Sequence, residues 1–404
     1  MTTPRRIAPW LFAAALLAFP CVAVGQADTA RPTPRRAPWH ERISIRGYTQ
    51  VRYNRLLETN ELLACPQCDR SIGRSGGFFI RRSRLVFSGD LHDRIAFYIQ
   101  PDLASDAGTQ LHFAQIRDAY VDVFLDARKE LRVRLGQSKV PFGWENLQSS
   151  SVRLPLDRAD ALNSGVPNER DLGLAFYWAP RAVRQRLRTL VDSGYKGTGD
   201  YGVLGLAVYN GQTANRPELN DGSHVAARAA YPVALPGGQL LEIGVQGYTG
   251  RFVIPASQRT AGVIGPEEFD DWRAAASVVW FPRPIGFQAE WNVGRGPEVD
   301  PVARVIAERR LTGGYGQVML RTGAGGISTI PYFRAQYYDG GKKLEQDGRR
   351  YLVREYEAGV EWLPVAALEL TAAYVLADRR AEDAAAPQNR QKGQLLRLQA
   401  QFNY

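Results

Sequence analysis

The chain has 404 residues, of which 45% are hydrophobic and 23% charged, and a formal net charge of +10 at pH 7. After the N-terminal region no stretch approaches the length of uncharged apolar sequence that a membrane-spanning helix needs, about 18 residues or more. In a cytosolic protein an excess of positive charge would indicate binding to nucleic acid. The interpretation of the charge therefore depends on the compartment in which the protein is located.

The first 25 residues have the features of a secretion signal. Arg5 and Arg6 precede an apolar run over residues 10–24. This run is shorter than the roughly 20 residues of a membrane-spanning helix. Cys21 is the one feature of a lipoprotein in this region, and the proline before it fits a lipidation motif badly. We therefore predict a cleaved signal peptide over 1–25, and export from the cytoplasm.

Residues 26–40 are rich in proline and arginine and show no apolar periodicity, which predicts a disordered arm. Without Arg5 and Arg6 the formal charge is still +8. In an exported protein that excess points away from nucleic acid. We expect small inorganic anions, and the phosphates of outer-membrane lipid and lipopolysaccharide, as partners.

The rest of the chain, 41–404, alternates between apolar and polar residues with period two. Between Leu131 and Ser138, for example, leucine and valine occupy one face while arginine and glycine occupy the other. Such alternation predicts β-strands with two unlike faces. Sixteen segments qualify: 41–56, 78–91, 93–104, 113–126, 131–139, 171–180, 201–213, 224–233, 240–253, 270–282, 285–296, 311–322, 328–338, 355–363, 368–379 and 394–404.

The connections between these segments alternate between short and long. An even number of strands with short turns at one end and long loops at the other is typical of outer-membrane barrels. Closure also removes unpaired edges, which lipid cannot satisfy. We predict an all-β fold, a transmembrane antiparallel β-barrel of 16 strands. The gap 181–200 is too long for a turn at the short end, and we assign it to strand extensions that the pattern does not resolve.

Strand parity predicts which charged residues face the inside of the barrel. The apolar residues of a strand share one face, which meets lipid, and the residues on the other face point into the lumen. By this rule the lumen-facing arginines are Arg46, Arg52, Arg82, Arg84, Arg132 and Arg134. On the lipid face an arginine at the membrane midplane costs about 2–4 kcal/mol. Arg81 has the wrong parity, so either a bulge intervenes or it lies beyond the lipid zone.

Cys65 and Cys68 lie in a polar segment, CPQC. In an oxidising compartment a local disulfide is the expected state. A zinc site would need two further ligands, which nearby residues do not supply. We therefore predict a disulfide that staples a loop, and no metal or cofactor.

Three motifs in order resemble one family of porins. The runs GFFIRRSRLVFSGDL (77–91), QIRDAY (115–120) and RLGQSKVPFGWENLQSS (134–150) resemble the phosphate-selective porin O/P family. The resemblance implies a barrel of sixteen strands that is typically trimeric. It also implies that the third outer loop, here 140–170, folds into the pore. It further implies that an anion constriction contains Arg81, Arg82, Asp118 and Lys139. Guanidinium groups match phosphate oxygens and replace part of an anion's hydration shell.

The expected function is passive diffusion of small anions through this constriction, with phosphate and polyphosphate as candidate solutes. The alternative within the same fold is a general diffusion porin with little selectivity. An outer-membrane barrel enzyme is a third hypothesis. None of the four histidines lies in a nucleophile motif, so we expect no enzymatic activity. A soluble binding protein is disfavoured because no series of amphipathic helices is present.

Overall fold

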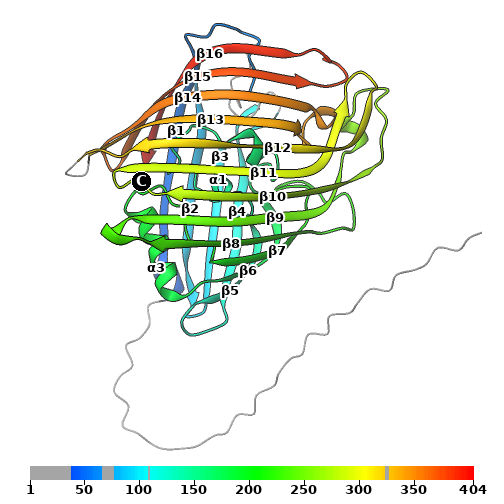
Figure 1. The fold of residues 1–404 in the computed structure, drawn as a ribbon. Coiled ribbons are helices and arrows are strands. Elements are labelled where there is room, and N and C mark those ends of the chain that lie inside the picture. The colour runs from blue at the N-terminus through cyan, green and yellow to red at the C-terminus, as the bar shows by residue number, and fades with distance from the viewer. Residues whose placement is uncertain (1–37, 66–76, 108–109, 324–326) are drawn as a thin grey trace, which may run out of the picture. The chain divides into compact units, whose positions relative to one another are not determined.

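The computed structural model describes residues 38–65, 77–107, 110–323 and 327–404. These residues form sixteen antiparallel strands that close into one barrel, because each strand pairs with its neighbours in sequence and β1 pairs with β16 (Figure 1). The prediction of a sixteen-stranded all-β barrel is confirmed. The strands are β1 (Ile43–Leu56), β2 (Phe78–His92), β3 (Ile95–Ala107), β4 (Gln110–Phe124), β5 (Leu131–Lys139), β6 (Arg170–Trp178), β7 (Leu204–Tyr209), β8 (His224–Ala234), β9 (Leu240–Val253), β10 (Glu268–Trp280), β11 (Ile285–Asp300), β12 (Val305–Leu320), β13 (Ser328–Gly341), β14 (Arg350–Val365), β15 (Leu368–Glu382) and β16 (Arg390–Asn403).

The two faces of the wall are inverted relative to a soluble protein. On β9 the apolar residues Ile243 and Val245 are 55% and 58% exposed, whereas the polar residues Glu242 and Gln246, which flank this pair, are 1% and 6% exposed. The outward face is therefore apolar, and the inward face is polar. A barrel with this pattern has lipid outside and a hydrophilic interior.

Connections of unequal length separate the two ends of the barrel. We call the end with residues 57–65 and 140–169 the loop end, and the opposite end, with residues 93–94 and 366–367, the turn end. Several of the long connections expected from the sequence are shorter in the structure, two of them markedly so. β3 and β4 extend through most of 105–112, and β11 and β12 extend through most of 297–310.

Three α-helices accompany the strands: α1 (Trp144–Leu147), α2 (Asp160–Asn163) and α3 (Arg181–Asp192). The assignment of 181–200 to strand extensions is wrong, because α3 fills most of that gap at the turn end, near the C-terminus (Figure 1). Short 3-10 turns are η1 (Trp39–Arg42), η2 (Pro236–Gly238), η3 (Ala256–Gln258) and η4 (Gln346–Gly348). In the part of the chain that the structure describes, none of the helices combines the length and the apolarity needed to cross a membrane.

α3 packs against the interior of the barrel. Val183, Leu187 and Leu190 lie on one face of the helix and form a buried apolar cluster with Trp144, in the connection after β5, and with Phe281, directly after β10. The helix therefore joins the turn end of the barrel to the loop that follows β5.

Candidate functional site: an arginine-rich interior held by loop 3

The connection 140–169, called loop 3 below, begins with a sharp turn encoded by the KVPFGW motif. Gly143 has a φ of 84°, a left-handed conformation that glycine adopts without strain. Phe142 before it is fully buried. The ammonium of Lys139, the last residue of β5, donates to the carbonyls of Leu147 at 2.8 Å and Gln148 at 2.9 Å. Lys139 thus satisfies the C-terminal end of α1.

Loop 3 is bound to the inward face of the distant wall. The Glu290 carboxylate on β11 accepts hydrogen bonds from the backbone N–H of Trp144 at 2.6 Å and of Glu145 at 3.1 Å. The Glu145 carboxylate in turn pairs with Arg334 of β13 at 2.9 Å. Since these partners belong to the polar, inward face, loop 3 lies against the interior surface of the barrel.

Asp157 is the centre of a second set of contacts, on the opposite side of loop 3. Its carboxylate lies 2.8 Å from Arg52, 3.3 Å from Arg81 and 3.8 Å from Arg82, and it also pairs with Arg397. Burial acts to raise the pKa of Asp157, but the four arginines, Arg52 most strongly, outweigh it and hold this pKa well below its usual range. Four cations around one carboxylate leave an excess of positive charge.

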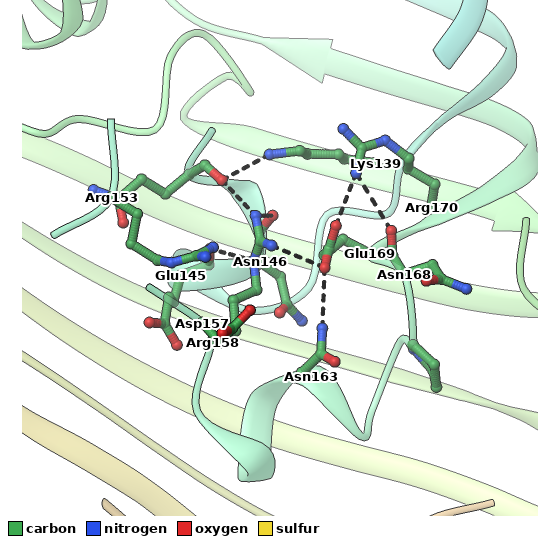
Figure 2. Close-up of polar contacts among 12 residues, drawn as sticks. Lys139, Glu145, Asn146, Arg153, Asp157, Arg158, Asn163, Asn168, Glu169 and Arg170 are labelled. Atoms are coloured by element: carbon green, nitrogen blue, oxygen red, sulfur yellow. Dashed lines mark hydrogen bonds and ion pairs between the residues drawn. The ribbon is translucent and has the colours of Figure 1, made fainter. Parts of the chain in front are cut away.

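Glu169, at the end of loop 3, gathers a further group of arginines (Figure 2). Its carboxylate pairs with Arg170 at 2.8 Å, Arg158 at 2.9 Å and Arg117 at 3.6 Å. Burial opposes ionisation here too. The field of Arg158, Arg170 and Arg117 is stronger, so the pKa of Glu169 is also well below normal.

Two β-bulges add arginines to the inward face. On β2, Gln50 of β1 pairs with Arg82 but Val51 pairs with Ile80, so Arg81 is an extra residue. Both Arg81 and Arg82 are buried as a result. The alternative of a bulge at Arg81 is confirmed. A β-bulge of this kind turns one additional side chain inward.

The second bulge lies on β4. Gln100 of β3 pairs with Asp118 and Pro101 pairs with Ile116, which leaves Arg117 as the extra residue. Arg117 and Asp118 are both buried. Simple alternation assigns Arg117 to the lipid face, so periodicity alone does not identify it as an inward-facing residue.

The arginines of β2, β4 and loop 3 surround a small cavity of about 30 Å³, called the arginine cavity below. Among the described residues five arginines and two carboxylates line it, a formal excess of three positive charges. Nothing apolar contributes to the lining, which consists of Arg81, Arg82, Arg84, Arg117, Asp157, Arg158, Asn163, Asn168 and Glu169.

Two arginines of this cavity have few partners. Arg82 donates to Gln50 at 2.8 Å, and Arg117 to the Asn168 carbonyl at 3.4 Å. The Nε atoms of both are buried without a hydrogen-bond partner among the described residues. Arg84, in contrast, is bound to Asp102 at 2.8 Å and to the Tyr48 hydroxyl at 2.9 Å. Arg82 and Arg117 therefore have the most donor capacity for a solute.

A larger cavity of about 570 Å³ lies towards the turn end, and we call it the turn-end cavity. It brings together five residues predicted from the sequence: Arg46, Asp118, Lys139, Arg132 and Arg134. Several of these cations are paired. Arg134 forms two hydrogen bonds with Asp122, at 2.8 and 2.9 Å, and Asp118 pairs with Arg170 at 2.9 Å.

The nine predicted pore residues thus separate into three groups. Arg81, Arg82 and Arg84 line the arginine cavity, and five others line the turn-end cavity. Arg52 lines neither of these two cavities and is bound to Asp157 instead. Arg158 and Arg170 were missed because they lie in or beside a loop without periodicity. Cys65 is disulfide-bonded. Cys68 lies outside the described residues, so the predicted pairing remains a prediction.

Comparison with known proteins agrees with this geometry. The sequence matches the family described as phosphate-selective porin O and P over residues 65–404. No protein with a curated description matches it. The solved structure of the outer membrane channel DcaP of Acinetobacter baumannii has a TM-score of 0.55 at 14% identity, over 90% of this chain and 97% of that chain.

Two further porin structures are similar. The anion-selective porin of Comamonas acidovorans has a TM-score of 0.53 at 10% identity, over 90% of this chain and 99% of that chain. OmpT of Vibrio cholerae, in a trimer form, has a TM-score of 0.51 at 10% identity, over 90% and 100%. At such identities the likeness shows the fold alone. Since the family match spans most of its length, the chain belongs to the phosphate-selective porin O and P family of outer-membrane porins.

Proposed function

We propose that this porin passes small inorganic anions, phosphate and polyphosphate among them, along a path through the arginine cavity. The observation that carries the proposal is the convergence of five guanidinium groups and two carboxylates on about 30 Å³. A space of that size is too narrow for an anion with its full hydration shell. An anion there exchanges water for charge-assisted hydrogen bonds, whereas a cation meets a repulsive field.

Loop 3 has the role of the constriction in this proposal. Its contacts with Glu290 and Arg334 fix it to the far wall, so the arginine cavity lies between loop 3 and the wall of β2 and β4. Arg82 and Arg117 contact the anion, because they have the most unused donors. Arg52 and Lys139 hold loop 3 in position.

The remaining predictions about the cell context belong to the same proposal. Residues 1–25 direct export and are removed. The predicted arm, 26–40, lies mostly outside the described residues, and its last two residues, Trp39 and His40, belong to η1 instead. The mature protein is a homotrimer in the outer membrane, in contact with its lipids and lipopolysaccharide. The trimer form of the Vibrio cholerae porin supports the assembly. Family and fold favour a channel over an enzyme.

A general diffusion porin is the competing function, and one observation favours it. In the turn-end cavity Asp118, Asp122 and Asp200 offset most of the positive charge of five cations. If that cavity controlled permeation, the channel would discriminate weakly between ions.

Titration of chloride current with phosphate tests the proposal. Purified protein is inserted into planar bilayers in KCl, and inorganic phosphate is added. We expect block of the chloride current, and a rise of about tenfold or more in the blocking concentration for Arg82→Gln/Arg117→Gln, since hydrogen bonds to charged groups are worth about 1.5–3 kcal/mol. Arg251→Gln, at a residue whose side chain is 66% exposed, is the control and leaves the block unchanged. A parent channel that phosphate does not block contradicts a phosphate path.

A further inference from the structure

We propose that the turn-end cavity is a binding site for a small aromatic carboxylate. The inference rests on the proposed anion function, since the carboxylate needs the same positive field. It concerns a different cavity, a different chemical class of solute and different residues from the arginine cavity.

Several parts of the chain line the turn-end cavity. The wall of β1–β5 forms one side, loop 3 contributes Leu147 and Val152, and the segment after β6 contributes Val191 and Tyr201. Its volume of about 570 Å³ falls within the range of small-molecule sites, about 300–1,000 Å³. A single inorganic anion would remain hydrated in a space of this size, so the cavity fits a larger solute.

A column of alternating aromatic and cationic side chains forms part of the wall. Tyr98 of β3 and Tyr120 of β4 are paired in register and stack with ring centroids 5.1 Å apart and planes 8° apart. The Arg134 guanidinium lies 3.7 Å from the Tyr120 ring centre, and Arg46 lies 5.8 Å from that of Tyr98. Since Tyr98 covers one face of Tyr120, Arg134 covers the other.

This stacking determines which parts of the two tyrosine side chains a solute can contact. Their faces are occupied, so their edges and hydroxyls face the cavity that they line. Neither hydroxyl has a hydrogen-bond partner among the described residues. Ring edges carry partial positive charge and attract the face of another aromatic ring. A flat aromatic solute therefore packs edge-to-face on Tyr98 and Tyr120 and accepts hydrogen bonds from their hydroxyls.

Arg46 is the guanidinium with the most unused donors for the carboxylate. Arg132 is held by the carboxylates of Asp122 and Asp200, each 3.5 Å from its Nη1, and it donates to the Asp200 carbonyl, which leaves its buried Nε without a hydrogen-bond partner in the described ranges. Arg46 is exposed and forms a single hydrogen bond, to Ser88 at 3.2 Å. Arg134 is committed to Asp122. Five cations against three carboxylates leave a formal excess of two positive charges in the cavity, which favours an anion.

Apolar side chains favour an aromatic anion over an inorganic one. Val86, Leu147, Val152 and Val191 contribute to the lining, and burial of apolar surface against them stabilises a benzene ring at about 25 cal/mol per Å². Phosphate and acetate gain little from these contacts. The arginine cavity has no such side chains, so the two cavities suit different solutes.

Block of single-channel current by benzoate, compared with acetate, tests this assignment, because the two anions differ in the ring and share the charge. Each is added to both sides of a bilayer that contains the full-length porin in KCl. We expect benzoate to block at a concentration about tenfold lower than acetate, and Tyr98→Leu/Tyr120→Leu to lower that ratio by about fivefold or more, since ring contacts are worth about 0.5–1.5 kcal/mol each. Tyr356→Leu, at an outward-facing tyrosine of β14, serves as the control and keeps the ratio of the parent chain.

Failure of the two proposals is distinguishable. Equal block by benzoate and acetate in an anion-selective channel overturns the aromatic site and leaves the anion porin intact. A cation-selective channel overturns the anion porin itself. If the leucine variant does not fold, Tyr98→Phe/Tyr120→Phe keeps both rings and removes both hydroxyls. It is expected to lower the benzoate preference by about threefold. An unchanged preference would contradict the proposed hydrogen bonds from the two hydroxyls to the solute.

Discussion

Arg52 on β1 and Asp157 in loop 3 are separated by 105 residues in the sequence and joined by a 2.8 Å ion pair. The same guanidinium donates to the Leu156 carbonyl at 2.9 Å and to Gln399 at 2.7 Å. Its donors are thus engaged by protein groups, although strand parity alone makes Arg52 indistinguishable from a pore-lining arginine. The relationship shows how an inward-facing charge serves to position loop 3.

Substitution Arg52→Gln should loosen loop 3 without removing it. Asp157 keeps Arg81, Arg82 and Arg397, so we expect a loss of about 1.5–3 kcal/mol in the free energy of unfolding and noisier, larger single-channel currents. Denaturant titration and bilayer recording measure the two effects. Arg251→Gln again provides the control. Unaltered currents together with unaltered stability would show that Arg52 does not hold the loop.

Deletion of Arg81 should leave a closed barrel. Removal of the extra residue makes Gln50–Arg82 and Val51–Ile80 consecutive pairs of a regular ladder, because a bulge is one residue inserted into one strand. Arg81→Gln keeps the bulge and removes the charge. We expect both variants to fold, as judged by heat-modifiable mobility on gels, and to lose anion selectivity to a similar extent. A deletion variant that fails to fold beside a folded Arg81→Gln would mean that closure requires the bulge.

Acid should break the ion pairs of Asp157, Asp160 and Glu169 in loop 3 only at very low pH. Burial acts to raise the pKa of Asp160, but Arg379 and Lys342 outweigh it and hold this pKa at about 2. Those of Asp157 and Glu169 are lowered as well. A depressed carboxyl pKa contributes stability that is complete above the unfolded value, about 4, and is lost as the pH falls through the folded value.

Conductance recorded at decreasing pH measures the loss of these ion pairs. We expect constant conductance from about pH 7 to 4 and an increase as the pH approaches about 2. A rise in conductance near pH 6 would contradict the account, since none of these three carboxyls gains a proton there.

Weakening the core of α3 should open the turn end. Leu187 is buried in the cluster that contains Trp144, and Leu187→Ala should lower the free energy of unfolding by about 2–5 kcal/mol and increase conductance. Arg188→Ala removes an exposed neighbour on the same helix and should change neither quantity. Equal conductance of the two variants would separate α3 from the conducting path.

The sequence predicts the strands well because lipid imposes alternation on them. β5 and β9 begin and end at the predicted residues 131–139 and 240–253. α3 was missed although Val183, Leu187 and Leu190 have the i, i+4, i+7 spacing of a helix. The helix has one narrow apolar stripe surrounded by arginines. This pattern is weaker than the alternation of the strands and does not by itself identify a helix.

The site was predictable only in part. Parity identifies Arg82 and Arg84 because both lie on a regular stretch of β2. It misassigns Arg117, because a bulge reverses the alternation and no local pattern marks one. Several ion pairs of loop 3 join residues more than a hundred positions apart, such as Glu145 and Arg334, and periodicity carries no information about them.

The reversal potential of single channels in a KCl gradient tests the central claim most directly, because its sign reports which ion is more permeant. The net positive charge of the arginine cavity predicts a reversal potential shifted towards the chloride equilibrium potential, and a smaller shift in Arg82→Gln/Arg117→Gln than in Arg251→Gln. A reversal potential on the potassium side in the parent chain would contradict the account.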